Sequence, residues 1–220
     1  SEQTPLSLGT EDIKKLLMRY AVPAIVAMTA ASLYNMMDSI FIGHGVGALG
    51  IAGLAVTFPF INLAAAFGSL VGVGASTLVS VKMGQKDLKS AEAVLGNVLL
   101  LNTVIGFLFM TVCLIFLDPI LYFFGASADT LPYARDYMKV ILYGNLITHI
   151  YMGLNEVMRA SGYPQRAMMA TLFAVLINGV LNALFIFVLD MGIKGAAIAS
   201  VLAEASSILF FLIYTYIMLI

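Results

Sequence analysis

The sequence is poor in charge and lacks tryptophan: Lys, Arg, Asp and Glu make up 10% of its 220 residues. Soluble domains carry about a quarter of their residues as charged side chains, so this composition excludes an ordinary water-soluble fold. Apolar residues make up 61% of the chain, which predicts the lipid bilayer as its main partner. The single cysteine, Cys113, excludes an internal disulfide bond.

Apolar runs of sufficient length are therefore the informative feature, because a bilayer core takes about 20 helical residues to cross. The fourth run is the most polar, and its Arg135 and Lys139 are expected to snorkel toward the outer surface. The pattern predicts an all-α membrane protein, with one bundle of six transmembrane helices over residues 20–220. The predicted spans are approximately 20–43, 51–81, 93–117, 133–159, 167–189 and 195–220.

The positive charges predict the orientation, since loops rich in Lys and Arg stay in the cytoplasm. Eight of the 11 basic residues lie before the first span or in alternate loops, which predicts cytoplasmic N- and C-termini. Residues 1–19 are expected to form an amphipathic cytoplasmic lead with Thr10 as a helix N-cap. A signal peptide ending near Ala30 is the weaker alternative, because the apolar run continues beyond it. No basic stripe suggests a nucleic-acid partner.

Two acidic residues fall within predicted spans, where charge is costly and usually functional. At about 1.5 Å of rise per residue, Asp38 lies about 8 Å and Glu204 about 15 Å below the outer boundary. Asn178, Asn182 and Ser200 fall at similar depths of about 18, 12 and 9 Å. The sequence therefore predicts that a carboxylate, two amides and a hydroxyl from three helices meet in the outer half of the bundle.

Such an all-oxygen set suits a hard cation or a proton, and the two would compete for one carboxylate. We therefore predict Na⁺ or H⁺ binding at Asp38, Asn178, Asn182 and Ser200, with Tyr34 as a possible hydrogen-bond donor to Asp38. The alternative for the amides, the hydroxyl and Tyr34 is plain helix packing. Glu204 is either a second proton site or a hydrogen bond between helices.

Proline positions predict two helix bends, at Pro23 and Pro59, because each ring removes a backbone hydrogen bond within a span. The sequence contains no catalytic constellation, phosphate loop or ligand cluster for zinc or haem. It therefore predicts a protein that is not an enzyme and needs no cofactor beyond a coupling ion.

Several segments together resemble the multidrug and toxic compound extrusion (MATE) family. They comprise Val22-Pro23-Ala24-Ile25, Met37 to His44, Met158-Arg159-Ala160-Ser161-Gly162, the pair Asn178 and Asn182, and Gly195 to Ser200. These segments are spread along nearly the whole chain in the order found in the family. The resemblance implies a secondary antiporter of the cell membrane, expected to be a prokaryotic inner membrane, that exports organic, often cationic, compounds in exchange for Na⁺ or H⁺.

The resemblance also implies a site at Asp38 with Asn178, Asn182, Ser200 and Tyr34 around it. Some members have Asp where Asn182 stands, so this chain has one carboxylate fewer, which leaves the choice of ion open. Family members have two six-helix lobes, so a second, C-terminal lobe is expected outside this chain, with a dimerising half-transporter as the alternative. A lipid-linked precursor flippase and a non-transporting membrane scaffold subunit are the competing functions.

Overall fold

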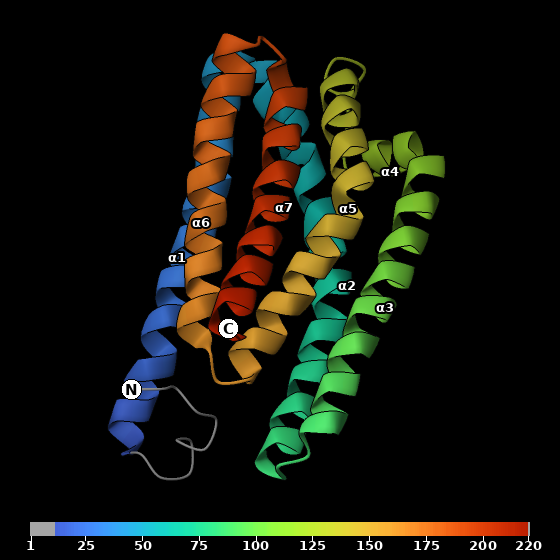
Figure 1. Cartoon of the computed structure of the whole chain (residues 1–220). Coiled ribbons are helices and arrows are strands. Elements are labelled where there is room, and N and C mark those ends of the chain that lie inside the picture. The colour runs from blue at the N-terminus through green and yellow to red at the C-terminus, as the bar shows by residue number, and fades with distance from the viewer. Residues whose placement is uncertain (1–11, 220) are drawn as a thin grey trace.

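The computed structural model describes residues 12–219, and this part of the chain contains helices joined by short turns and no strands (Figure 1). Thr10 lies outside the described residues, and the first helix begins at Ile13 with Asp12 as its N-cap. Its elements are α1 (Ile13–Gly45), α2 (Ala48–Gly84), α3 (Leu88–Ile115), α4 (Leu117–Phe123), α5 (Leu131–Ala160), α6 (Pro164–Asn182), the π-helical turn η2 (Ala183–Val188) and α7 (Gly192–Leu219).

Helix ends follow local capping chemistry, which extends the helices beyond their predicted apolar runs. The Asp12 carboxylate accepts from the backbone N–H groups of Lys14 and Lys15 at 2.8 and 3.4 Å, so α1 starts at Ile13 rather than at residue 20. The Asp87 carboxylate caps α3 in the same way. Pro164 stands at the first position of α6, where a missing N–H costs nothing.

Two elements differ from the predicted spans. The short helix α4 was expected to be a loop, yet it follows directly after α3. The predicted fifth span, residues 167–189, is an α-helix only to Asn182 and continues as the π-helical turn η2. A count of apolar residues cannot distinguish α from π winding, because it does not depend on the number of residues per turn.

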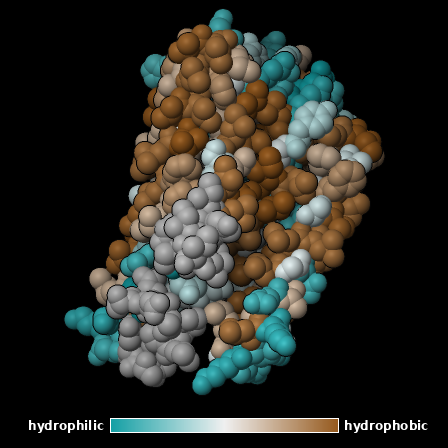
Figure 2. Space-filling view, viewed as in Figure 1, coloured by the Kyte–Doolittle hydropathy of each residue, from teal (hydrophilic) through white to brown (hydrophobic). Residues whose placement is uncertain are grey.

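Five of these helices are long and apolar enough to cross a membrane: α1, α2, α3, α6 with η2, and α7. Helix α5 is 30 residues long, or about 45 Å at the helical rise, but it contains Arg135, Asp136 and Lys139 near its start. Its crossing stays a prediction, as does the count of six. Figure 2 shows apolar residues over the middle of the visible face and hydrophilic residues at both ends of the bundle.

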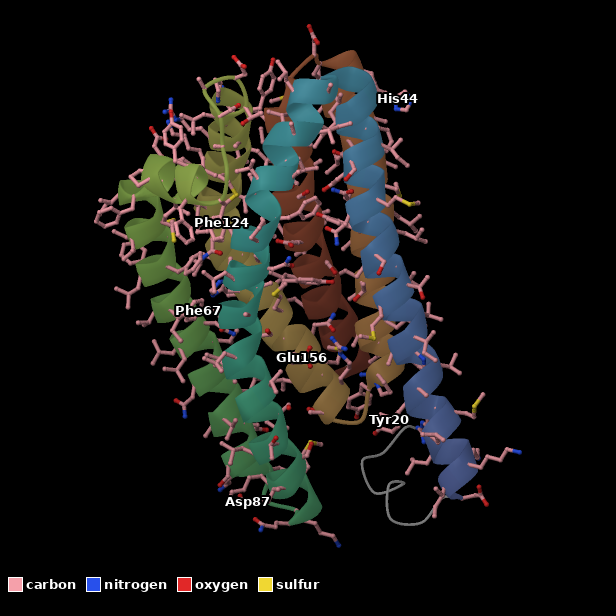
Figure 3. All side chains as sticks on the ribbon, turned by 180° about the vertical axis from the view of Figure 1, so that it is seen from behind. Tyr20, His44, Phe67, Asp87, Phe124 and Glu156 are labelled. Atoms are coloured by element: carbon pink, nitrogen blue, oxygen red, sulfur yellow. The ribbon has the colours of Figure 1, made fainter. Side chains whose placement is uncertain are left out.

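The helices form two flanks around a central pair. Helix α1 packs mainly against α6, α2 packs against α3 and α5, and α5 and α7 lie between the two flanks (Figure 1). Helices α1 and α2 make few contacts with each other. His44 lies at one end of the bundle and Asp87 at the other (Figure 3). We call the His44 end the outer end, following the predicted orientation.

Both prolines lie inside continuous helices, Pro23 in α1 and Pro59 in α2. Bending at these positions therefore stays a prediction. Helix α7 runs back toward the end at which α1 begins (Figure 1). The cytoplasmic location of that end also stays a prediction.

Candidate functional site

The candidate site centres on Asp38 of α1, whose side chain is buried at 4% exposure. Asn182 Nδ2 donates to Asp38 Oδ1 at 2.5 Å, and Ser200 Oγ lies 3.3 Å from Asp38 Oδ2. Ser200 Oγ also lies 3.1 Å from the carbonyl oxygen of Ala196, and its single proton can serve only one of the two acceptors. Asp38 is therefore bound by groups from α6 and α7, the two helices that the sequence predicts.

The two asparagines of α6 close a ring of four side chains. Asn182 Nδ2 also donates to Asn178 Oδ1 at 3.0 Å, and Asn178 Nδ2 donates to Ser200 Oγ at 3.3 Å. Both amides are fully buried. We call Asp38, Asn178, Asn182 and Ser200 the acidic cluster. The structure brings together all four residues of the predicted oxygen set.

One hydrogen-bond acceptor in the acidic cluster has no donor. Asn182 Oδ1 is buried and has no hydrogen-bond partner among residues 12–219. A buried carbonyl oxygen without a donor costs about 1–3 kcal/mol, and a bound cation would remove that cost. The cluster thus offers a carboxylate and a neighbouring unpaired amide oxygen, both of them ligand types that hard cations prefer.

Small residues let the three helices approach closely enough to form this ring. A Cβ atom on Gly179, which lies between the two asparagines, would stand 2.6 Å from Cε of Met37, the residue before Asp38. On α7, Ala196, Ala197 and Ala199 surround Ser200 and are fully buried. Close approach of helices through small side chains is the usual packing mode in membranes, and here it positions Asp38 against α6 and α7.

Tyr34 does not make the predicted bond to Asp38. Its hydroxyl is buried and has no hydrogen-bond partner in the described part of the chain. Tyr34 and Asp38 are one turn apart on α1, but the acidic cluster already surrounds the carboxylate with donors from α6 and α7. Tyr34 instead lines a neighbouring cavity.

That cavity of about 320 Å³ lies inside the lobe, between α1 and α2 and against α5, α6 and α7. Asp38, Ser200 and Glu204 all line it, so the acidic cluster and the second predicted acidic residue share one space. The existence of this space depends on how far α1 stands from α2, which hydrophobic patterns do not report.

The partner of Glu204 was also missed. Thr148 Oγ1 of α5 donates to Glu204 Oε2 at 2.5 Å. This bond links two helices, as one of the two predicted roles of Glu204 requires. Thr148 follows Asn145 by three residues, and both line the cavity, so a polar stripe at helical spacing on α5 was the available signal.

The described residues give little support for the binding of a transition metal. No group of three His, Cys, Asp or Glu side chains that could hold a metal ion occurs within the described residues. The acidic cluster has one carboxylate and no nitrogen or sulfur ligand beyond its amides. It therefore matches a proton or a hard monovalent cation, but not a transition metal.

The comparisons with known proteins agree with this architecture. The MatE family model matches residues 23–184. The multidrug export protein MepA of Staphylococcus haemolyticus is 30% identical over 202 residues, which cover 92% of this chain and 45% of that protein. The chain thus spans about half the length of the curated relatives it matches.

Solved structures match over nearly the whole chain. One is described as the outward-facing conformation of a multidrug resistance MATE family transporter of the MOP superfamily; it is 29% identical with a TM-score of 0.87, over 95% of this chain and 47% of that one. Another, described as MATE in the bent conformation, is 28% identical with a TM-score of 0.87, over 96% and 47%. Because the family model matches well over half of its residues, this chain belongs to the MatE family and is a multi-pass protein of the cell membrane.

Proposed function

We propose that the protein containing this chain is a secondary active antiporter that exports organic, often cationic, compounds in exchange for Na⁺ or H⁺. The observation that carries the proposal is Asp38, a buried carboxylate that lines a cavity and is surrounded by amide and hydroxyl groups. No Lys or Arg lines this cavity. A carboxylate in such a place needs a mobile positive partner, because an unpaired charge within a membrane is costly.

The acidic cluster supports a coupling role for this partner. Asp38 and Asn182 Oδ1 supply oxygen atoms for a cation, and the same carboxylate accepts a proton. The two ions would therefore exclude each other at one site. A site that alternates between a cation and an empty or protonated state gives the transporter a way to link an ion gradient to ligand release.

The organic ligand is inferred from the cavity and from the relatives. Tyr34, Phe58, Tyr137 and Tyr151 give the cavity aromatic walls, which suit flat or cationic compounds. A relative that is 30% identical over most of this chain is a multidrug export protein. We infer small organic compounds as substrates, and a second six-helix lobe as the other half of the machine, since this chain spans about half of its relatives.

Pro23 gives a means by which the cluster could respond to conformation. It is buried in α1, the helix that carries Asp38. Since a proline within a helix permits bending, we propose that α1 bends at Pro23 and so changes the distance between Asp38 and α6. One similar structure is described as bent, which motivates this extension.

A lipid-linked precursor flippase fits less well. Its substrate carries phosphate groups, which require Lys or Arg side chains in the binding space. Here the charged residues that line the cavity are Asp38 and Glu204, both acidic. A pyrophosphate would meet two carboxylates and no base, so the cavity argues against an anionic substrate.

The test is Asp38→Asn in the full-length protein, reconstituted in vesicles with an imposed Na⁺ or pH gradient. We expect gradient-driven efflux of ethidium to fall to the level of protein-free vesicles, because a neutral amide has no charge to balance a cation and does not accept a proton at physiological pH. Asp190→Asn is the matched control: Asp190 is exposed and has φ of 51°, a conformation that Asn also tolerates. Normal efflux by Asp38→Asn would overturn the antiport mechanism based on Asp38, whereas no efflux from wild type would favour a scaffold role.

A further inference from the structure

The cavity contains a second carboxyl group, that of Glu204 on α7. Glu204 follows Ser200 by one turn of α7, and both line the cavity. Its Oε2 atom accepts from Thr148 of α5 at 2.5 Å. The bond holds the carboxyl group at the boundary between α5 and α7, where it reaches the cavity that Asp38 also reaches from α1.

The surroundings of the two carboxyl groups differ in a way that separates their roles. Asp38 has a neighbouring donor at each oxygen, Asn182 at one and Ser200 at the other, and is almost fully buried. Glu204 has its hydrogen bond at Oε2, and no bond to Oε1 is found among the described side chains. The residue is only partly buried, because it borders the cavity. Glu204 is therefore the carboxyl group with an oxygen open to a ligand.

The rest of the cavity supplies what an organic cation needs. Four aromatic rings line it, those of Tyr34, Phe58, Tyr137 and Tyr151. Aromatic faces attract cations through their quadrupoles, most strongly where water is excluded. The Tyr34 hydroxyl is buried and has no partner among residues 12–219, so it also awaits a ligand. A cavity of about 320 Å³ is at the lower end of the range that small organic molecules occupy.

We propose that Glu204, and not Asp38, pairs with the positive group of an organic cation in this cavity, while Asp38 holds the coupling ion. The inference rests on the proposed antiport function and assigns its two ligands to two carboxyl groups. Binding of both at once would place two positive charges in one membrane cavity, and their repulsion would make each weaken the other. This coupling is reciprocal, as linkage requires.

The experiment uses purified full-length protein in detergent with tetraphenylphosphonium, a permanent cation that carries no titratable proton. Equilibrium dialysis measures its affinity, and the rise of the melting temperature with added Na⁺, or with falling pH, measures the ion site. Glu204→Gln should weaken binding of the probe by about tenfold or more, as expected for a lost desolvated ion pair, and should leave the ion response unchanged. Glu92→Gln, at an exposed position of α3, is the matched control.

Asp38→Asn should show the reverse pattern, with the ion response lost and probe affinity kept within about threefold. Glu204→Asp preserves the charge on a shorter side chain and should bind the probe with intermediate affinity, which separates loss of charge from misfolding. Normal probe binding by Glu204→Gln, or a large loss in Asp38→Asn, would overturn the assignment. Loss of probe binding in Glu204→Gln together with no ion response in wild type would support the Glu204 site and reject the antiport function.

Discussion

Two groups of buried polar residues lie within this bundle, and they differ in how well they are paired. The acidic cluster of Asp38, Asn178, Asn182 and Ser200 forms a ring of hydrogen bonds between α1, α6 and α7. The second group, which we call the histidine group, consists of Asn102, Asn145 and His149 at the contact of α3 and α5. Asn102 and His149 are fully buried, and none of their side-chain nitrogen or oxygen atoms has a hydrogen-bond partner in the described chain.

The difference lies in access as well as in pairing. Asp38 and Ser200 line the cavity, whereas Asn102 and His149 do not. Unpaired polar groups away from any ligand reduce stability, while paired groups beside a cavity are positioned for binding. Burial of polar residues within a membrane is thus not enough to identify a site, because the pairing and the access decide which group acts.

The strongest test makes the same substitution in both groups. Asn182→Leu removes the donor to Asp38 and to Asn178 at once, so ion-driven efflux from vesicles should be lost. Asn102→Leu removes an amide that has no partner, so efflux should persist and the free energy of unfolding should rise by about 1 kcal/mol. Equal loss of efflux in the two variants would contradict the distinction between the groups.

The next test concerns the glycines that bring helices together on each side. A Cβ atom on Gly144 of α5 would contact Cγ2 of Val201 and stand 3.0 Å from its Cβ. Because the branched valine cannot move aside, Gly144→Ala should cost about 1–3 kcal/mol and weaken the bond between Thr148 and Glu204. Thermal unfolding of the full-length protein in detergent measures this cost.

Gly106→Ala, on the side of the histidine group, is the control for that measurement. Its new Cβ would lie 3.4 Å from His149 Nδ1, an ordinary contact. We expect no loss, and a gain of up to about 1 kcal/mol from helix propensity. If the two substitutions destabilised the protein equally, α5 would pack as tightly against α3 as it does against α7.

Asn145 connects the two groups and should show a smaller effect. Its Nδ2 donates to the carbonyl oxygen of Gly106 at 3.1 Å, and its side chain also borders the cavity. Asn145→Leu should lower the free energy of unfolding by about 0.6 kcal/mol, the mean for hydrogen bonds between membrane helices. Efflux should fall only slightly, since Asn145 contacts neither Asp38 nor Glu204 in the hydrogen-bond network. A loss as large as that in Asn182→Leu would place Asn145 in the site.

The acidic cluster could be predicted from the sequence because it depends on quantities that a sequence contains. Helical rise gives the depth of Asp38, Asn182 and Ser200, and helix direction gives the end from which to count. Depth cannot tell which helices touch, however. The bond between Thr148 and Glu204 depends on the packing of α5 against α7. The spacing of one turn between Tyr34 and Asp38 likewise does not show whether the two side chains form a hydrogen bond.

The elements that were missed share a physical cause. Helix α4 is only seven residues long, below the length that periodicity can detect. The turn η2 follows Asn182 directly, and π winding is typical of functional positions but has no composition of its own. The polar start of α5 did not prevent its prediction, since the helix was expected over residues 133–159 and is found over Leu131–Ala160. Sequence alone does not show, however, that Arg135 is paired with Asp118 and Lys194 with Asp136.

The last comparison sets the buried Asp38 beside a carboxylate that is exposed to water, that of Asp87. Substitution of Asp87 should give the smallest effect of the variants considered. Asp87 caps α3, and hydrogen bonds from Ser90 hold the pKa of its carboxyl group below the usual value. A lowered pKa in the folded state means that the group stabilises the protein above its unfolded pKa of about 3.9 and loses this contribution as the pH falls through the folded value. Asn also caps helices but does not titrate.

Asp87→Asn should therefore leave the melting temperature nearly unchanged at neutral pH. As the pH falls toward about 3, the melting temperature of the variant should decrease slightly less than that of wild type. The measurement is the difference in melting temperature between wild type and variant across this range. The Asp87 side chain is exposed to water, whereas Asp38 is buried, so the pH dependence removed here should be small beside the loss of ion response in Asp38→Asn. A larger effect at Asp87 would mean that exposure to water matters less than the number of hydrogen-bond donors.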